Sequence, residues 1–432
     1  MRIAIAFPIL SRNYTSRYLM IVFDIISLTL LAVLLFWTVY NGSIIYIGVK
    51  NKRKQQATEN TIQNLPKISL IVPTKNEENV IGRCLDGILN IDYPKDKMQV
   101  IVVDGNSSDG TCKVCLEFSE KYPGIFRIIS EATAKGKPAA LNLALPYVKG
   151  ELVGTFDADS LPERDVLKKV ASYFNDKKIT AVQGRTTSIN EKSNALTRVI
   201  SKEEKAWFQM LLSGREKLQL FVPLTGSCQF VRTNVLEEMG GWDENSLTED
   251  VELALRLVEK EHLIKYAPDV CSGQETPDNL SGLIKQRVRW YRGYMETAIK
   301  YGRLLDKINK RTMDAEISMA GPFMMVVSLL SYLNWFFIAI FLSQSSPILD
   351  FTGLVIALTA VSIVSIGVAL TASEKPIKLK NLVWIPTIYV YWLIQMVIAG
   401  WAFLNLLFRR KREWTKTTKK GISDEVSDNL LV

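Results

Sequence analysis

Two kinds of hydrophobic pattern divide the chain. From Lys67 onward, short runs rich in valine and isoleucine alternate with stretches of helical periodicity. The short runs are ISLIVP, MQVIVVD, FRIIS, ELVGTFD and ITAVQG, and helices are predicted between them at Glu77–Leu89, Asp109–Lys121, Lys137–Val148 and Glu163–Phe174. Continuous apolar runs separated by helices are typical of βαβ units, whose parallel sheet is buried on both faces. The pattern therefore predicts an α/β fold with a mostly parallel sheet.

Longer apolar runs lie on either side of this region. Tyr18–Val49 exceeds the length of about 20 residues that a transmembrane helix needs, and it lacks the cleavage site of a signal peptide. Three further runs lie near Ile317–Leu342, Ile348–Leu370 and Leu382–Phe408. We therefore predict one soluble block, from about residue 50 to residue 312, held between α-helical transmembrane segments.

Charge supports a membrane topology. Basic clusters at Lys50–Lys54 and Lys307–Arg311 flank the soluble block and place it in the cytoplasm by the positive-inside rule. Much of the net charge of +9 therefore belongs to topology, and nucleic-acid binding is not predicted. If all three C-terminal runs cross, the basic tail Arg409–Gly421 ends outside, against the same rule. We therefore expect one of these runs to be re-entrant or interfacial.

Cysteine and histidine usage excludes several chemistries. The five cysteines fall in the predicted cytoplasmic block and are expected to be free thiols. Cys112 and Cys115 form a CxxC, but no second pair stands at a zinc-finger spacing. The only histidine, His262, reads as a surface or loop residue. A histidine base and a histidine-rich metal site are therefore disfavoured.

Three polar clusters directly follow predicted strands. They are Thr74–Glu78 (TKNEE), Asp104–Thr111 (DGNSSDGT) and Asp157–Ser160 (DADS). Ligands of parallel sheets bind at the carboxyl ends of the strands, so these clusters are the first candidates for a site. Asp109 is expected to cap the following helix, whereas capping and a binding role stay equally open for Asp104.

The acidic pair Asp157 and Asp159 points to a cation. Two carboxylates one residue apart repel each other unless a cation or hydrogen-bond donors offset their charge, and a divalent ion that also holds a phosphate is the simplest offset. Lys135 and Lys137 precede a helix that opens at Pro138, which makes a plausible anion cradle, although alone they also read as solvated lysines. A metal-bridged diphosphate fits both observations.

Two further stretches carry candidate chemistry. Thr248, Glu249 and Asp250 open a strongly helical stretch and read as a capping segment, but a rigidly held carboxylate also suits a general base. The stretch Ile284–Arg303 (IKQRVRWYRGYMETAIKYGR) is rich in basic and aromatic residues close to an apolar run. It reads either as a basic helix lying on a bilayer or as part of a site.

The motifs VVDGNSSDGT, DAD, TED and QRVRW, in this order between predicted transmembrane segments, resemble those of membrane-integrated family 2 glycosyltransferases. This family includes cellulose, hyaluronan, chitin and poly-N-acetylglucosamine synthases. The resemblance covers about residues 66 to 302, and the set of four motifs is far more specific than any one of them. It implies a Rossmann-like GT-A catalytic domain with a mostly parallel sheet, joined to transmembrane helices.

The resemblance implies donor-binding roles at the sheet edge. Asp104 would bind the nucleoside of a nucleoside-diphosphate sugar, in a pocket shared with Thr74 and Glu77. Lys137 would contact the diphosphate. Asp157 and Asp159 would hold the donor through Mg²⁺ or Mn²⁺.

It also implies the catalytic and acceptor residues. Asp250, with Glu249 beside it, would take the proton from the acceptor hydroxyl in an inverting displacement. Gln286 and Arg289 would bind donor phosphate, and Trp290 would stack on the acceptor sugar.

Two features bear on the donor and on topology. Lys75 stands where many synthases carry tyrosine, so a UDP-sugar is expected but a GDP-sugar stays open. Trp414–Thr417 (WTKT) resembles the tail of hyaluronan synthases that closes over the nucleotide, and this role requires a cytoplasmic tail.

The resemblance favours a processive polysaccharide synthase of the plasma membrane with a cytoplasmic catalytic domain. The alternative is a non-processive enzyme that glycosylates a ceramide-type or polyprenyl-phosphate-type lipid, and a third hypothesis is a non-catalytic sugar-nucleotide-binding partner. The acceptor is thus a glycan or a lipid, and an accessory subunit stays open. The predicted order is N-terminal tail 1–17, transmembrane helix 18–49, basic linker 50–65, catalytic domain 66–275, interfacial helices 276–312, transmembrane region 313–408 and basic cytosolic tail 409–432.

Overall fold

The computed structural model describes residues 6–51, 65–133, 135–302, 309–341, 384–412 and 419–421, with scattered residues between 353 and 367. The chain divides into two compact units. We call residues 44–320 and 405–432 the sheet unit, and residues 1–43 and 321–404 the helical unit. Each is described by itself.

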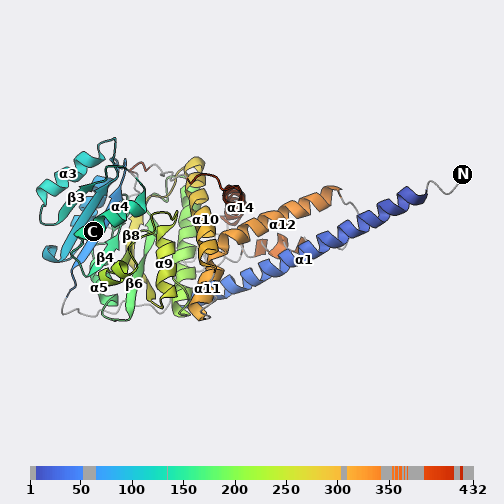
Figure 1. The fold of residues 1–432 in the computed structure, drawn as a ribbon, viewed down its shortest axis with the longest axis horizontal. Coiled ribbons are helices and arrows are strands. Elements are labelled where there is room, and N and C mark those ends of the chain that lie inside the picture. Colours follow the sequence, from blue (N-terminus) through green and yellow to red (C-terminus); the bar gives the residue numbers. More distant parts are fainter. Residues whose placement is uncertain are drawn as a thin grey trace. The chain divides into compact units, whose positions relative to one another are not determined.

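A mixed sheet forms the centre of the sheet unit (Figure 1). Its eight described strands run in the order β3-β2-β1-β4-β7-β6-β8-β5. They are β1 (Ile68–Thr74), β2 (Met98–Asp104), β3 (Phe126–Ser130), β4 (Leu152–Thr155), β5 (Leu161–Pro162), β6 (Ile179–Ser188), β7 (Gln229–Arg232) and β8 (Leu263–Gln274). Strands β3, β2, β1 and β4 are parallel, as predicted. Strand β7 runs antiparallel to both β4 and β6, and β5 runs antiparallel to β8, whereas β6 and β8 are parallel, so the second half of the sheet is mixed.

The helices of the sheet unit follow the predicted alternation: the helix predicted from Lys137 starts there, and those predicted from Glu77, Asp109 and Glu163 start two to four residues later. They are α2 (Ile81–Leu89), α3 (Thr111–Lys121), α4 (Lys137–Ala144), α5 (Val166–Tyr173), α6 (Ala195–Ala206), α7 (Ser213–Lys217), α8 (Thr233–Glu238), α9 (Glu249–Glu259), α10 (Leu280–Tyr301) and α11 (Lys310–Met319), with short turns η1 (Lys95–Lys97) and η2 (Leu145–Tyr147) and a π-helix η3 (Trp207–Leu212). Helix α2 begins at Ile81 and not at Glu77, and the backbone N–H of Glu77 donates to Oγ1 of Thr111, the first residue of α3.

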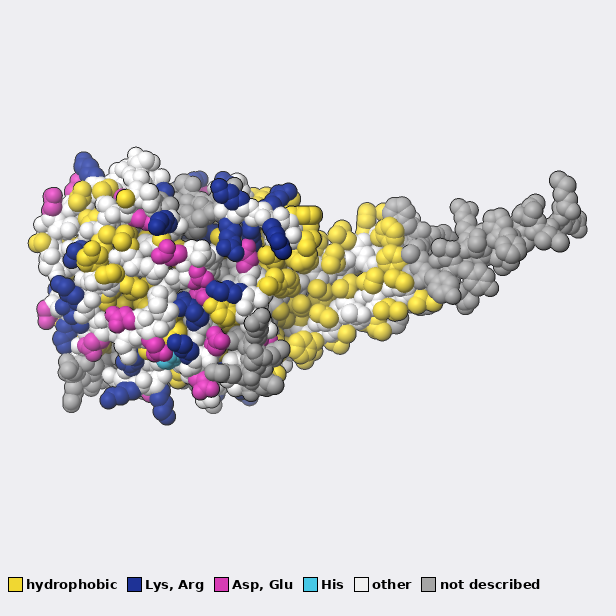
Figure 2. All heavy atoms as spheres, viewed as in Figure 1, with side chains coloured by type: hydrophobic (Ala, Val, Ile, Leu, Met, Phe, Trp, Pro, Cys, Tyr) yellow, Lys and Arg dark blue, Asp and Glu magenta, His cyan; other side chains and the backbone are white. Residues whose placement is uncertain are grey.

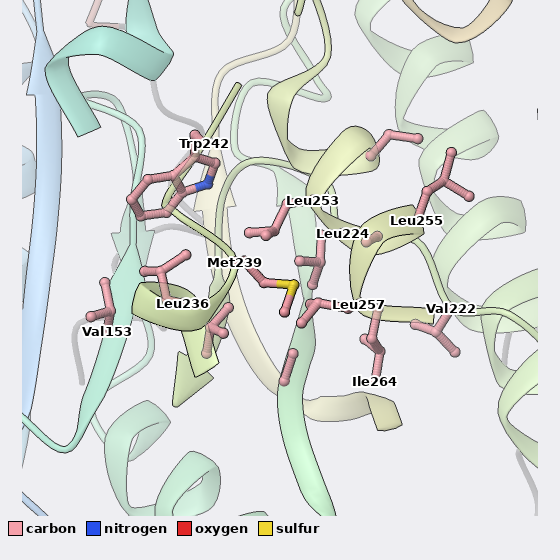
Figure 3. Packing of buried hydrophobic residues seen from close by; sticks show 14 of the residues in the cluster. Val153, Val222, Leu224, Leu236, Met239, Trp242, Leu253, Leu255, Leu257 and Ile264 are labelled. Carbon is pink, nitrogen blue, oxygen red and sulfur yellow. The ribbon is translucent and has the colours of Figure 1, made fainter. Parts of the chain in front are cut away.

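Helix α9 is held by a hydrophobic cluster (Figure 3). Its buried Leu253 and Leu257 belong to one cluster with Leu236 and Met239 near α8 and with Val153 of β4. Full burial of one such side chain is worth roughly 1.5–3 kcal/mol. The apolar side of α9 is thus fixed in the core, and its first turn, which carries Glu249 and Asp250, sits on a rigid element.

A buried ion pair joins α7 to α11. Arg215 Nη1 lies 2.5 Å from Asp314 Oδ2, and both side chains are almost completely buried. Asp314 Oδ2 also accepts from the backbone N–H of Phe221 at 2.8 Å. The pair therefore attaches the helix that precedes the second apolar region to the sheet unit.

The variant Asp314→Asn is expected to destabilise the protein by about 3 kcal/mol, because it leaves the Arg215 charge buried without its counter-charge. Thermal unfolding in detergent, followed by tryptophan fluorescence, measures the loss. Met313→Ala on the same helix, where the side chain is 42% exposed, is the control and should change stability little. Equal melting temperatures for both variants would contradict a stabilising role of the pair.

The end of α1 (Ala6–Asn51) belongs to the sheet unit and packs closely on α7 and η3. A Cβ atom on Gly214 would lie 2.1 Å from the carbonyl oxygen of Ile44, and one on Gly48 would lie 1.9 Å from that of Met210. Only glycine allows the backbones to approach so closely. These contacts fix the point at which α1 enters the sheet unit.

The helical unit comprises most of α1 together with α12 (Gly321–Phe341) and α14 (Ile385–Leu407). Among the described residues, two helical segments are long and apolar enough to cross a membrane, Ile21–Lys50 and Ile385–Leu407, or three if Lys310–Met319 and Gly321–Phe337 form one span. Figure 2 shows mainly hydrophobic side chains on the visible surface of α12, where Leu333 and Phe336 are more than half exposed. Such a surface suits lipid. The predicted run at 348–370 lies largely outside the described residues.

Candidate active site

The loops after β1 and β2 interlock at one edge of the sheet. Thr74 and Asp104, the last residues of these strands, are direct neighbours in the parallel register. Beyond them, the backbone N–H of Asn76 donates to Ser107 Oγ at 2.8 Å, and Asn76 Oδ1 accepts from the N–H of Ser108 at 2.7 Å. The structure therefore brings Thr74, Glu77 and Asp104 to one place.

The two aspartates of this region differ in role. Asp109 Oδ1 accepts from the backbone N–H of Thr111 at 3.0 Å and so satisfies the first N–H of α3, but the N-cap residue is Gly110 and not Asp109 as expected. Asp104 is 3% exposed and accepts from the N–H and hydroxyl of Ser107, at 3.2 and 2.5 Å, within its own loop. The Oγ1 of Thr74 is buried and has no hydrogen-bond partner among the described residues. A buried, unsatisfied hydroxyl at a strand end is able to bind a ligand.

Lys137 and Asp157 form an ion pair beside this edge. Lys137 Nζ lies 2.6 Å from Asp157 Oδ1 and 3.8 Å from Glu249 Oε1, and it donates to the carbonyl of Gly226 at 2.9 Å. Burial disfavours the ammonium, but Asp157 and Glu249 outweigh burial, so the pKa of Lys137 lies above its ordinary value. The lysine predicted to bind an anion is thus already paired with two carboxylates.

Asp250 and Lys137 both approach Gly226. A Cβ atom on Gly226 would lie 2.9 Å from Asp250 Oδ2 and 3.0 Å from Lys137 Nζ, and the φ of this glycine is 79°. Only glycine suits this position, because a side chain would meet both charged groups and the positive φ favours glycine. Burial and the neighbouring Glu249 raise the pKa of Asp250 to about 7, although Lys137 and Arg289 oppose the shift.

The capping prediction for Thr248 is wrong in detail. Helix α9 begins at Glu249, but the side chain of Thr248 caps none of its backbone N–H groups. Its Oγ1 lies 3.4 Å from Thr297 Oγ1 on α10 instead. Thr248 therefore links the two helices that carry the TED and QRVRW motifs.

One face of α10 packs on the start of α9. Gln286, Arg289, Trp290 and Gly293 are spaced i, i+3, i+4 and i+7 and so share this face. A Cβ atom on Gly293 would lie 2.5 Å from the Thr248 side chain, and Arg289 Nη1 lies 3.5 Å from the carbonyl oxygen of Leu247. Trp290 is half-buried, with the Arg287 guanidinium 4.5 Å from its ring centre. The motif thus lies on the helix that touches the Asp250 segment.

Several residues of the site were missed by the sequence analysis. Ser227 Oγ accepts from the backbone N–H of Asp157 at 3.2 Å, beside Gly226. Asp159 Oδ2 accepts from the N–H of Glu275 at 3.0 Å and pairs with Lys419 Nζ at 2.7 Å. The glycine in TGSCQF was a usable signal, whereas nothing local marked Glu275. The predicted tail segment Trp414–Thr417 lies outside the described residues.

The fold is that of a GT-A glycosyltransferase. A solved structure of the mannosyltransferase PcManGT from Pyrobaculum calidifontis, in complex with GDP-Man and Mn²⁺, superposes with a TM-score of 0.58. The two chains are 21% identical, and the match covers 90% of this chain and 100% of that one. The expected fold class is confirmed.

The chain belongs to the family 2 glycosyltransferases. The family model described as "Glycosyltransferase like family 2" matches residues 66–293, which contain all four motifs. The resemblance found in the sequence is thereby confirmed.

Curated relatives include both polymer and lipid enzymes. The probable glycosyltransferase YdaM of Bacillus subtilis is 33% identical over 66% of this chain and 69% of its own. The beta-monoglucosyldiacylglycerol synthase of Trichormus variabilis is 33% identical over 60% of this chain and 56% of its own. The poly-beta-1,6-N-acetyl-D-glucosamine synthase of Staphylococcus epidermidis is 25% identical over 87% of this chain and 92% of its own.

Proposed function

We propose that this chain is an inverting glycosyltransferase that moves a sugar from a nucleoside-diphosphate sugar to a hydroxyl of a membrane-proximal acceptor. The observation that carries the proposal is the position of Asp250. Its carboxylate has a pKa of about 7 and lies at Gly226, which Lys137 of the Lys137–Asp157 pair also approaches. A base and a charged group suited to a diphosphate thus lie side by side on rigid elements.

The proposed nucleoside site is the edge formed by β1 and β2. Asp104 is fixed by Ser107, and the buried Thr74 hydroxyl is available to a ligand. Glu77 is half-buried in the same interlocked loops. In this arrangement Asp104 and Thr74 would bind the nucleoside, and Lys137 would bind the diphosphate. A UDP-sugar is the proposed donor and a GDP-sugar the alternative.

The carboxylate oxygens of the proposed site suit a hard divalent cation. Asp157 and Asp159 provide carboxylate oxygens, and the described residues contain no group of three or more metal-ligating side chains. Mg²⁺ in phosphate sites is commonly held by one or two carboxylates, with water and phosphate oxygens completing the shell. The proposed role of Asp157 and Asp159 is therefore to hold Mg²⁺ or Mn²⁺. When bound, the ion supplies charge stabilisation for the departing diphosphate.

Proton transfer follows from the α9 geometry. Asp250 accepts the proton of the acceptor hydroxyl as the oxygen attacks the anomeric carbon, and Lys137 stabilises the negative charge that develops on the leaving diphosphate. Glu249 is 4% exposed and 3.8 Å from Lys137, so its proposed part is to hold Lys137 and to raise the pKa of Asp250. The acceptor would lie against the α10 face, with Trp290 stacking on a sugar and Gln286 and Arg289 near donor phosphate.

The rate should depend on pH with an apparent pKa of about 7. Asp250 acts as a base only when it is ionised, so turnover falls as pH drops through the pKa of this group. Because Lys137 lowers this pKa, Lys137→Met should move the acidic limb of the pH–rate profile to higher pH. The same variant should also weaken donor binding. Rate profiles between pH 5 and pH 9 measure the shift. Lys135→Met, which removes an exposed lysine two residues away, should leave the limb in place.

The proposed product is a polysaccharide. The match to the poly-N-acetylglucosamine synthase covers 87% of the chain, whereas the match to the glucosyldiacylglycerol synthase covers 60%. That second match has the higher identity, however, so a lipid acceptor is retained as the alternative. The proposed location is the plasma membrane, and the basic flanking clusters favour a cytoplasmic catalytic domain.

The purified protein in detergent, incubated with Mg²⁺ or Mn²⁺ and a panel of UDP- and GDP-sugars, tests the proposal. Release of nucleoside diphosphate with one donor and a high-molecular-weight labelled product is expected. A small product that forms only with added lipid would favour the lipid enzyme. Nucleotide binding without release under any condition would contradict a catalytic function and favour a binding partner of another synthase.

A further inference from the structure

The C-terminal tail returns to the proposed metal-binding edge. After α14, the carbonyls of Arg410 and Lys411 accept from Arg292 of α10, at 2.6 and 3.2 Å. Arg412 pairs with Glu296 of the same helix at 3.1 Å. Further along the chain, Lys419 Nζ lies 2.7 Å from Asp159 Oδ2. The tail is thus attached at two places on the sheet unit.

Glu275 connects this tail to Asp159. Its backbone N–H donates to Asp159 Oδ2, and its carbonyl accepts from Lys419 Nζ at 2.5 Å. Its carboxylate accepts from Arg83 at 2.9 Å and from the backbone N–H of Lys420 at 3.0 Å. Glu275 is 4% exposed, so these contacts are shielded from solvent. The residue after the lysines, Gly421, packs against the backbone of Asn79.

The position of Lys419 conflicts with a divalent cation on the same carboxylate. The side chains of Asp159 and Lys419 are 5% and 15% exposed, so solvent screens their charges weakly. A cation bound to Asp159 lies about 2.0–2.2 Å from its oxygen, next to an ammonium at hydrogen-bond distance. The repulsion between the two positive centres disfavours simultaneous binding.

We propose that Lys419 and the divalent cation bind Asp159 in competition, so that binding of the metal and nucleotide releases residues 419–421 from the sheet unit. The inference rests on the proposed metal-dependent donor site. It makes Lys419 a positioning residue for the tail, and it makes Glu275 the residue that couples the tail to Asp159.

Mn²⁺ affinity tests the competition directly. Free Mn²⁺ is measured by electron paramagnetic resonance during titration of the full-length protein in detergent. Lys419→Met should bind Mn²⁺ roughly 5-fold more tightly than the wild type, the effect of losing one partly shielded ion pair. Lys113→Met, which removes an exposed lysine on α3, should bind as the wild type does. Unchanged or weaker binding by Lys419→Met would overturn the proposal.

Hydrogen exchange gives a second readout. Addition of Mn²⁺ and UDP or GDP to the wild type should increase exchange at residues 419–421, because the Lys420 N–H no longer donates to Glu275. A decrease would overturn the proposal and would mean that the tail closes over the bound nucleotide. If Mn²⁺ binds equally to the wild type and to Lys419→Met, the proposed competition is wrong but the metal-dependent donor site stands. If it binds to neither, the metal-dependent donor site is wrong as well.

Discussion

Replacement of Asp250 by asparagine is expected to lower turnover by roughly 10²–10⁴-fold, the usual contribution of a general base. Donor affinity should change little, because the asparagine keeps the size of the side chain and Lys137 keeps its partners Asp157 and Glu249. Single-turnover rates and UDP or GDP affinity, measured on the same preparation, separate the two effects.

Two variants of α9 serve as comparisons for this experiment. Glu259→Gln changes an exposed acid at the other end of the helix and should leave turnover unchanged. Glu249→Gln should show a smaller loss than Asp250→Asn and a lower pKa for the rate profile, because Glu249 raises the pKa of Asp250. Near-normal turnover of Asp250→Asn would show that another group takes the proton.

Asp159→Asn is expected to remove metal-dependent donor binding, with a loss of roughly 10²–10³-fold in nucleotide affinity in the presence of Mn²⁺. The neutral amide is a poor ligand for a hard cation, whereas the hydrogen bond from the Glu275 N–H can be kept by the amide oxygen. Titration with UDP and GDP, with Mn²⁺ and then with EDTA, measures the difference. Asp165→Asn, an exposed acid paired with Lys169, is the control. Equal Mn²⁺-dependent affinity in Asp159→Asn and the wild type would contradict the metal assignment.

The parallel half of the sheet was predictable because each strand has a local signal. Runs such as MQVIVVD are buried on both faces and are followed by a helix, which leaves few other arrangements. The four-residue strand β7 carries no such signal for direction. Its antiparallel pairing depends on β4 and β6, which lie far away in the sequence.

The same distinction holds for the candidate site. The hydrogen bond from the first N–H of α3 to Asp109 was predictable, since it joins residues two positions apart. The contact of Thr248 with Thr297 spans 49 residues, and the hydrogen bond from Glu275 to Asp159 spans 116. Such contacts depend on tertiary packing, which a local pattern does not contain. The motif resemblance identified the candidate residues, while their geometry came from the fold.

The attachments of α11 and of Arg410–Arg412 also constrain how the chain threads a bilayer. Asp314 ties α11 to Arg215, and Arg292 and Glu296 hold the chain after α14, all within the sheet unit. Both ends of the intervening apolar region therefore belong to the sheet unit. If the sheet unit lies on one side of a bilayer, as the sequence predicts, the chain between these ends makes an even number of complete crossings. An even count keeps the basic C-terminus on the side that the positive-inside rule favours.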